Sequence, residues 1–446
     1  MIKYTRLFLT FLLAVIVLDA SAQSTATTSS PYSRYGLGDI SDQLLPQNIG
    51  MGGIAVATNT IGGYNSINVI NPASYGKINF TVIDIGASSN TTTFSKIGLA
   101  DQQNTNARLS HILFAMPVTR NSAFSFGLMP YSELGYNYKT TKTNFGTGSS
   151  VDTNAVNYIY SGEGSLSKAY LGYGITLFKH LSIGANASYI FGSLKQFQST
   201  EVPSLYGVLD SRAEQDNHVK GVNFDYGAQY TFDFSESKHL ILGYSGSAGS
   251  KLNVDNTYIV SQYTRDVNGN ENNALDTLVN QQNPNGKIKL PQINRFGVVY
   301  QYEGKFLVGA DYTMGKWSDL SIAGVNQGLQ DSKMINVGGQ WTPNVNALNN
   351  FFALIDYRLG FIYEQTYLGQ TALGVAGANL KRTAITAGLG IPLPHDRASS
   401  AFYKINFSAE VGQRGQLANG LIKENYVNFH LGFTLNDRWF QRFKFE

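Results

Sequence analysis

The chain has 446 residues, with 33 Lys and Arg against 30 Asp and Glu, and therefore a net charge of +3. Charged residues are only 14% of the total, whereas soluble domains use about 25%. The small net charge and the lack of a basic stripe exclude a nucleic-acid partner, and the scarcity of charge argues against an ordinary soluble domain.

The first segment, residues 1–22, is a predicted signal peptide. Lys3 and Arg6 precede an apolar run, Leu7–Leu18, that is too short to span a membrane, and Ala20-Ser21-Ala22 is a small-x-small cleavage site. No later stretch approaches the ~18 apolar residues that a membrane helix needs. The mature chain is therefore either secreted or a β-barrel of a bacterial outer membrane.

Composition favours the barrel. The chain contains 27 Tyr, 26 Phe and 46 Gly, as expected for aromatic girdles at the membrane borders and small residues in a lumen. It contains no Cys, so it has neither a lipid-modified cysteine nor a disulfide framework.

Two segments precede the first predicted strand. Residues 23–49 form a polar arm that we expect to lack regular structure, and to line the barrel floor or contact a partner. Residues 50–77 begin with a glycine cluster (Gly50, Gly52, Gly53) and include the triplet Asn71-Pro72-Ala73. Glycine permits close backbone approach and positive φ, and the segment is too short for a core of its own. We predict a plug inside the barrel; a surface loop ahead of the barrel is the alternative.

The same residues carry a resemblance. The series Met51, Gly52, Gly53 and then, after a spacer, Asn71, Pro72, Ala73 resembles the N-terminal hatch of the FadL family of outer-membrane long-chain fatty acid transporters. The segments 290–297, 309–312, 316–319 and 385–391 also look like strands of that family. The resemblance covers the chain in patches, and it implies a barrel with a hatch and a hydrophobic substrate.

Residues 78–436 alternate apolar and polar side chains, which indicates strands with one apolar face. In Ala401–Gly412, for example, Tyr403, Ile405 and Phe407 alternate with Lys404 and Asn406. Six short turns alternate with seven long loops, among them 260–287, as in bacterial outer-membrane barrels. The sequence therefore predicts an all-β fold, a transmembrane antiparallel barrel of fourteen strands with an N-terminal plug.

If the aromatic faces of the strands contact lipid, a set of charged and apolar side chains faces the lumen. The charges either form an ion-pair lattice that holds barrel and plug or meet an anionic head group, while the apolar members suit an amphiphile. The candidate ligand contacts are Arg295, Leu307, Asp311, Leu354, Arg358 and Lys404.

Pro130 lies inside the predicted third strand. Proline removes a ladder hydrogen-bond donor and is found at edges or bulges, yet a closed barrel has no edge. The resembled family has a kinked third strand that opens the lumen sideways. We therefore consider a lateral gate at Pro130, the alternative being a proline beyond the membrane band.

No catalytic set is apparent. The six His residues are scattered, and no nucleophile elbow or phosphate loop occurs. We expect no enzyme activity and no cofactor. Asp266, Asn268 and Asn270 are spaced as in calcium loops, but the terminal bidentate Glu is missing, so a solvated loop is the preferred interpretation.

The last segment, residues 437–446, is aromatic and basic. It is predicted to anchor the chain at the inner rim or to dock a periplasmic partner.

The whole sequence predicts passive outer-membrane uptake of hydrophobic or amphiphilic molecules such as fatty acids. Its contacts would then be that ligand, outer-membrane lipid and an envelope protein. The competing prediction is an assembly subunit of an outer-membrane complex that transports nothing, favoured by the long arm and the tail.

Overall fold

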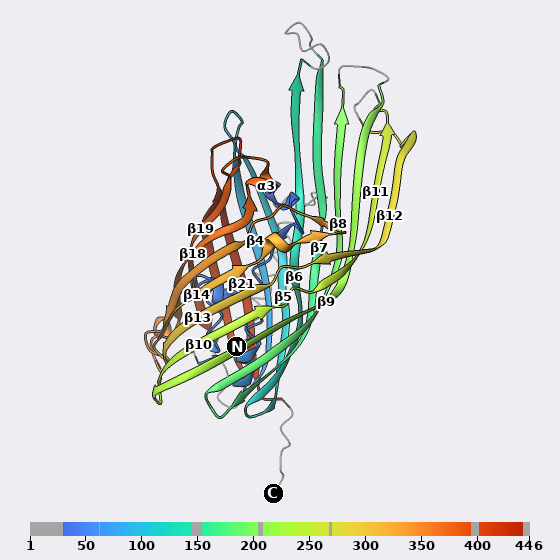
Figure 1. Cartoon of the computed structure of the whole chain (residues 1–446). Coiled ribbons are helices and arrows are strands. Elements are labelled where there is room, and N and C mark those ends of the chain that lie inside the picture. Colours follow the sequence, from blue (N-terminus) through green and yellow to red (C-terminus); the bar gives the residue numbers. More distant parts are fainter. Residues whose placement is uncertain are drawn as a thin grey trace, which may run out of the picture.

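The computed structural model describes residues 30–61, 63–144, 154–203, 208–266, 270–393 and 401–439. Within these residues the wall is an antiparallel sheet of 14 strands, which closes because β21 (Lys423–Asp437) pairs with β4 (Thr81–Ser95) (Figure 1). The predicted fourteen-stranded barrel is confirmed. No helix in the described segments is long and apolar enough to cross a membrane. The predicted signal peptide lies outside the described residues.

The wall strands follow one another around the barrel in chain order, and two of them are interrupted midway. β10 continues as β11 after a break at 248–250, and β12 continues as β13 after a break at 290–292. The remaining bounds are β5 (Gln102–Thr119), β6 (Ser122–Thr143), β7 (Ala155–Leu177), β8 (Leu181–Glu201), β9 (Asp210–Ser235), β10 (Lys238–Ser247), β11 (Lys251–Tyr263), β12 (Asp276–Lys289), β13 (Ile293–Tyr302), β14 (Phe306–Gly315), β17 (Ser332–Trp341), β18 (Asp356–Gly369), β19 (Asn379–Pro392) and β20 (Phe402–Gly415).

The two faces of the wall follow from the period-2 alternation of each strand. On β20, Phe407 and Val411 are exposed on the outer face, whereas Asn406, Ser408 and Glu410 are buried on the lumen face. This is the inverse of a soluble sandwich, in which apolar side chains face inward, and it is the arrangement of a barrel whose outer surface contacts lipid.

The barrel is much taller on one side. β6, β7, β8 and β9 have 22, 23, 21 and 26 residues, against 14 or 15 for β18 to β21. The hairpins β6–β7, β8–β9 and β11–β12 therefore project beyond the rest of the wall (Figure 1). The predicted loop 260–287 was wrong in extent: β11 continues to Tyr263 and β12 begins at Asp276, because the two segments pair with each other outside the membrane band.

The lumen contains the N-terminal part of the chain. Its elements are η1 (Pro31–Arg34), β1 (Asp39–Ile40), α2 (Pro46–Ile49), the hairpin of β2 (Thr60–Ile61) and β3 (Tyr64–Asn65), and η2 (Pro72–Lys77). The arm thus has short regular elements, contrary to the prediction of none. It also does not line the floor: Tyr32 and Ser30 contact the outer ends of β20 and β21 through Ile422 and Glu424.

The remaining short elements belong to the loops. β15 (Ser321–Ile322), β16 (Val325–Asn326), η3 (Trp317–Asp319) and α3 (Gln370–Leu373) lie at the outer rim, and η4 (Phe351–Leu354) lies in the turn between β17 and β18. Leu354 is therefore in a turn at the opposite rim, not on a lumen-facing strand as predicted, because β18 begins only at Asp356.

Candidate functional site

The plug lies directly against the wall because glycines meet on both sides. Gly52 has a φ of 70° and donates its N–H to Thr386 Oγ1 at 2.8 Å. A Cβ at Gly52 would lie 2.6 Å from the carbonyl oxygen of Val337, and one at Gly360 in the wall would lie 2.0 Å from the nitrogen of Gly52. Any side chain at either position would force plug and wall apart.

Two polar side chains, Asp311 of the wall and Asn71 of the plug, connect plug and wall by hydrogen bonds to backbone groups. Asp311 Oδ2 on β14 accepts hydrogen bonds from the N–H groups of Ala55 and Val56, at 2.6 and 2.8 Å. Asn71 Nδ2 donates to the carbonyl oxygen of Val56 at 2.6 Å and to those of Ala228 and Tyr244 in the wall, at 3.3 and 3.2 Å. Asp311 is thus part of the plug's attachment.

Pro72 and Ala73 continue from Asn71 into η2, which packs against the lower parts of β7 and β8. Asn71 Oδ1 accepts from the N–H of Ala73 at 3.1 Å and so begins this helix. Met51 is fully buried and packs in one apolar cluster with Leu307 of β14. The predicted plug residues and Leu307 therefore form contacts between plug and wall, and Leu307 lines neither of the chambers described below.

A buried ion cluster joins three further wall residues. Asp356 Oδ2 lies 3.0 Å from Arg358 Nη2 and 2.6 Å from Lys404 Nζ, and all three side chains are nearly inaccessible. The guanidinium of Arg358 also donates to Gln340 and Asn406, both at 2.8 Å. Since both cations have partners, neither Arg358 nor Lys404 is available to an anionic head group in this arrangement.

The arm is attached by ion pairs near the outer rim. Arg414 Nη1 lies 2.8 Å from Asp39 Oδ1, and Arg382 Nη2 lies 3.0 Å from Asp42 Oδ2. On the wall side, Arg414 also pairs with Glu424 at 2.7 Å. Sequence analysis missed these arginines. The alternation of apolar and polar residues within their strands could have identified them as lumen-facing. The arm's aspartates could not be matched to them without the structure.

Tyr32 strengthens this attachment. Its hydroxyl donates to the carbonyl oxygen of Ile422 at 2.7 Å. Burial raises the pKa of Tyr32 to about 12, so the phenol remains a neutral donor at any physiological pH.

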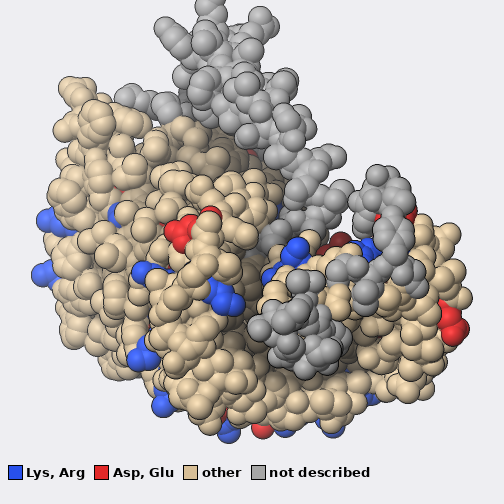
Figure 2. All heavy atoms as spheres, turned by 90° about the horizontal axis from the view of Figure 1, so that it is seen from above, with Lys and Arg blue, Asp and Glu red and all other residues tan. Residues whose placement is uncertain are grey.

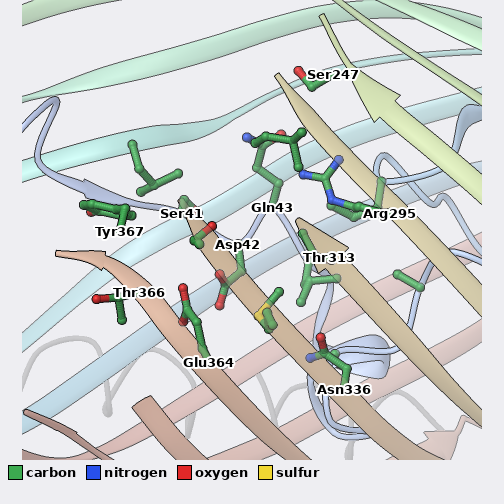
Figure 3. A pocket seen from close by; sticks show the side chains of 18 of the residues that line it. Ser41, Asp42, Gln43, Ser247, Arg295, Thr313, Asn336, Glu364, Thr366 and Tyr367 are labelled. Atoms are coloured by element: carbon green, nitrogen blue, oxygen red, sulfur yellow. The ribbon is translucent and has the colours of Figure 1, made fainter. Parts of the chain in front are cut away.

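A first chamber of about 170 Å³ lies between the arm, the plug and β13, β14, β17 and β18. Arg295 lines it and reaches toward Gln43, while Asp42 lies beside Glu364 (Figure 3). Among the described residues, Arg295 makes no ion pair within 4.0 Å, so of the predicted cations only Arg295 combines a chamber position with an unpaired guanidinium. Apolar side chains such as Val69, Met334 and Trp317 complete the lining.

A second chamber of about 230 Å³ lies on the other side of the arm, and residues 39–44, Arg382 and Arg414 line both chambers. Most of its lining residues are polar or charged, with Ile49, Met129 and Ile362 among the apolar ones. Three of its atoms, Ser132 Oγ, Asn428 Oδ1 and His430 Nε2, are buried without a hydrogen-bond partner among the described residues. Such atoms call for water or a polar ligand group.

The wall is split beside the second chamber. β5 and β6 pair from Thr119 and Ser122 only as far as Ile112 and Leu128, while β6 continues to pair with β7. Pro130 lies just beyond the last pair, at a bulge. Beyond it β1 takes the edge of β6, with Ile40 opposite Ser132, and the side chains of Arg108 and Glu133 form an ion pair across the split.

The weak calcium candidate is only partly described, since Asn268 lies outside the described residues. Asp266 Oδ1 accepts from the N–H of Asn270 at 2.8 Å, and Asp266 Oδ2 accepts from its amide at 3.1 Å. No group of three acidic or His side chains that could hold a metal ion occurs in the described parts of the chain. The carboxylate therefore bonds to the backbone and the side chain of Asn270. Most of the predicted anchoring tail, from residue 440 on, also lies outside the described residues.

Comparison with solved structures shows the same fold at low sequence identity. The toluene transporter TodX of P. putida is 15% identical, with a TM-score of 0.59 over 92% of this chain and 100% of that chain. The toluene transporter TbuX of Ralstonia pickettii is 14% identical, with a TM-score of 0.54 over 89% of this chain and 98% of that chain. A FadL homologue of Pseudomonas aeruginosa is 12% identical, with a TM-score of 0.54 over 91% and 100%.

Sequence comparison gives a different name from the structural one. No curated protein matches the chain. The model of the family described as BamG, however, matches residues 1–446, which is the whole chain. The fold is therefore shared with FadL-type channels, while the chain itself belongs to the BamG family.

Proposed function

We propose that this protein is a bacterial outer-membrane barrel that acts as an assembly or scaffold subunit of an envelope protein complex, without transporting a substrate. The observation that carries the proposal is the filled lumen. Plug and arm are attached by backbone hydrogen bonds and by partly exposed ion pairs. Each of the two chambers, of about 170 and 230 Å³, is smaller than the ~300–1,000 Å³ of ligand pockets.

The chemistry of the lumen supports the same role. A long-chain amphiphile that passed the ion clusters would lose apolar contacts at about 0.8 kcal/mol for each CH₂. Both chambers are bordered by the Asp42–Arg382 and Asp39–Arg414 pairs, so a ligand would have to pass these charges.

The tall hairpins offer the surface on which such a partner would dock. Leu275 and Leu278, at the outer end of the β11–β12 hairpin, are 65% and 55% exposed. They lie on a hairpin that projects beyond the rest of the wall (Figure 1). Their exposure on this projecting hairpin supports a protein contact there.

The test is co-purification from membranes in mild detergent. We expect a stoichiometric protein partner with the wild-type chain and its loss with Leu275→Ser/Leu278→Ser. The matched control is Ile97→Ser/Leu99→Ser, which removes two equally exposed side chains from the short β4–β5 turn and should retain the partner. Purification of the wild-type chain alone, with a small molecule in its lumen, would overturn the proposal.

The wall split favours a second candidate function, lateral transfer of an amphiphile. The structural neighbours TodX and TbuX, which are toluene transporters, agree with it. Arg295 agrees with it as well, as a contact for a carboxylate. In this function the ligand would be captured at the outer loops, displace the arm and leave between β5 and β6 near Pro130.

For this candidate, Pro130→Ala should slow uptake of a fluorescent long-chain fatty acid, because it restores a ladder donor at the split. The control is Pro117→Ala, in the part of β5 that already pairs with β6, which should leave uptake unchanged. Uptake is compared at matched surface abundance. Equal uptake by the wild type and Pro130→Ala would remove the lateral gate and leave the assembly role.

A further inference from the structure

We propose that the outer face of β17 to β21 and β4 binds a phosphorylated glycolipid of the outer leaflet. Its phosphates would lie on a row of lysines and its acyl chains in the depression beneath that row. The inference rests on the proposed outer-membrane location, and it is independent of whether the barrel assembles or transports.

The lysine row follows from strand register. Lys333 of β17 and Lys381 of β19 both lie opposite Gln365 of β18. Lys423 of β21 lies opposite Gly415 of β20 on one side and Ser95 of β4 on the other. Directly paired residues share a face, and neighbouring strands are ~4.8 Å apart. Successive lysines are therefore two strands, or about 10 Å, apart along one line of paired residues that runs across the strands.

The row faces outward. Each lysine lies an even number of positions from exposed apolar residues of its own strand and therefore shares their face. Lys333 shares it with Ile335 and Val337, Lys381 with Ile385, and Lys423 with Phe429. Seen from outside the membrane, basic side chains are spaced along one side of the rim (Figure 2). The three lysines thus lie at the border between the exposed apolar band and the outer rim.

The acidic side chains of the same strands face the other way. Glu364, Glu410 and Glu424 are directed to the lumen, where they pair with Arg382 and Arg414. The exposed carboxylates Asp101 and Asp331 lie in loops, and Asp331 accepts a hydrogen bond from Ser318. None of the three lysines makes an ion pair within the described residues, so the row is a positive strip without its counter-charge.

Two further levels lie beneath the lysines. The first is polar and hydrogen-bonding, with Thr383, Gln413, Asn425 and Thr93 in register across β19, β20, β21 and β4. The second is apolar, and it consists of Phe361, Ile385, Val411 and Val427.

Both levels line a shallow depression of about 500 Å³ on the outer surface. From the membrane outward the surface is thus apolar, then polar, then cationic. This order matches acyl chains, the amide and hydroxyl groups of a glycolipid backbone, and phosphate. A row of three lysines can contact more than one phosphate.

The experiment titrates lipid A into the detergent-solubilised full chain and counts bound lipid by native mass spectrometry. The variant Lys333→Gln/Lys381→Gln/Lys423→Gln should bind about a hundredfold more weakly than wild type, since each lysine near an anionic surface contributes about a factor of five. The control Lys139→Gln/Lys142→Gln/Lys251→Gln makes the same charge change on the exposed β6 and β11 and should bind as wild type.

Two more measurements separate phosphate from acyl recognition. Lipid A treated with phosphatase should lose affinity for the wild type but not for the triple variant. Val411→Trp fills the depression and should weaken binding of both lipid forms. Equal binding by wild type and the lysine variant, an equal loss in the control, or equal binding of dephosphorylated lipid A would each overturn the inference. So would a co-purified protein that protects the lysine row from chemical labelling.

Discussion

Deletion of residues 50–74 is expected to convert the closed barrel into an open pore. The wall closes through the β21–β4 pairing, which involves no plug residue. A barrel of this size leaves an aqueous channel unless it is filled. In planar bilayers, the deleted protein should therefore show large stable conductance steps where the wild type shows none, and vesicles should leak small dyes.

Its control shortens the exposed β4–β5 turn by removing residues 98–100, outside the lumen, and should remain closed. A second variant tests the attachment directly. Asp311→Ala removes the acceptor of the Ala55 and Val56 amides and should give transient openings. Wild-type conductance after the deletion would contradict the plug assignment, whatever the physiological role of the barrel.

Asp356→Ala is expected to be the most destabilising single substitution in the lumen. Asp356 is the common partner of Arg358 and Lys404, and its side chain is almost fully buried. Removing it leaves two buried cations without a counter-charge, and breaking such a cluster costs roughly 3–5 kcal/mol. The free energy of unfolding by urea, measured in lipid vesicles, should fall by about this amount.

Lys404→Met is the matched comparison. It removes one cation but keeps the Asp356–Arg358 pair at 3.0 Å, so its loss should be clearly smaller than that of Asp356→Ala. If both substitutions cost the same, or if Asp356→Ala is neutral, the cluster does not stabilise the wall. The interpretation of the lumen charges as an ion-pair lattice would then fail.

The two functional proposals differ in what they require of the lumen. A transporter needs the arm to leave the chambers. This movement would break the Asp39–Arg414 and Asp42–Arg382 pairs. A scaffold needs none of this, since its proposed contacts lie on the tall hairpins. The attachment of the arm is therefore the feature that most favours the assembly role.

The sequence by itself determined the barrel and its strand number, because alternation along a strand is a local property. Strands such as Ala401–Gly412 show one apolar face whatever their neighbours are, and short turns alternating with long loops fix the up-and-down order. The same alternation placed Asp311, Arg358 and Lys404 on the lumen side, where the structure has them buried.

Only the tertiary structure decided what those residues contact. Register between strands and the path of the arm are non-local, so Asp39 could not be matched to Arg414 across 375 positions of sequence. For the same reason, the sequence showed a proline at 130 but not the end of the β5–β6 pairing beside it, and it showed three separate lysines but not one row. Local patterns specify which face a side chain occupies; the closure of the sheet specifies its neighbours.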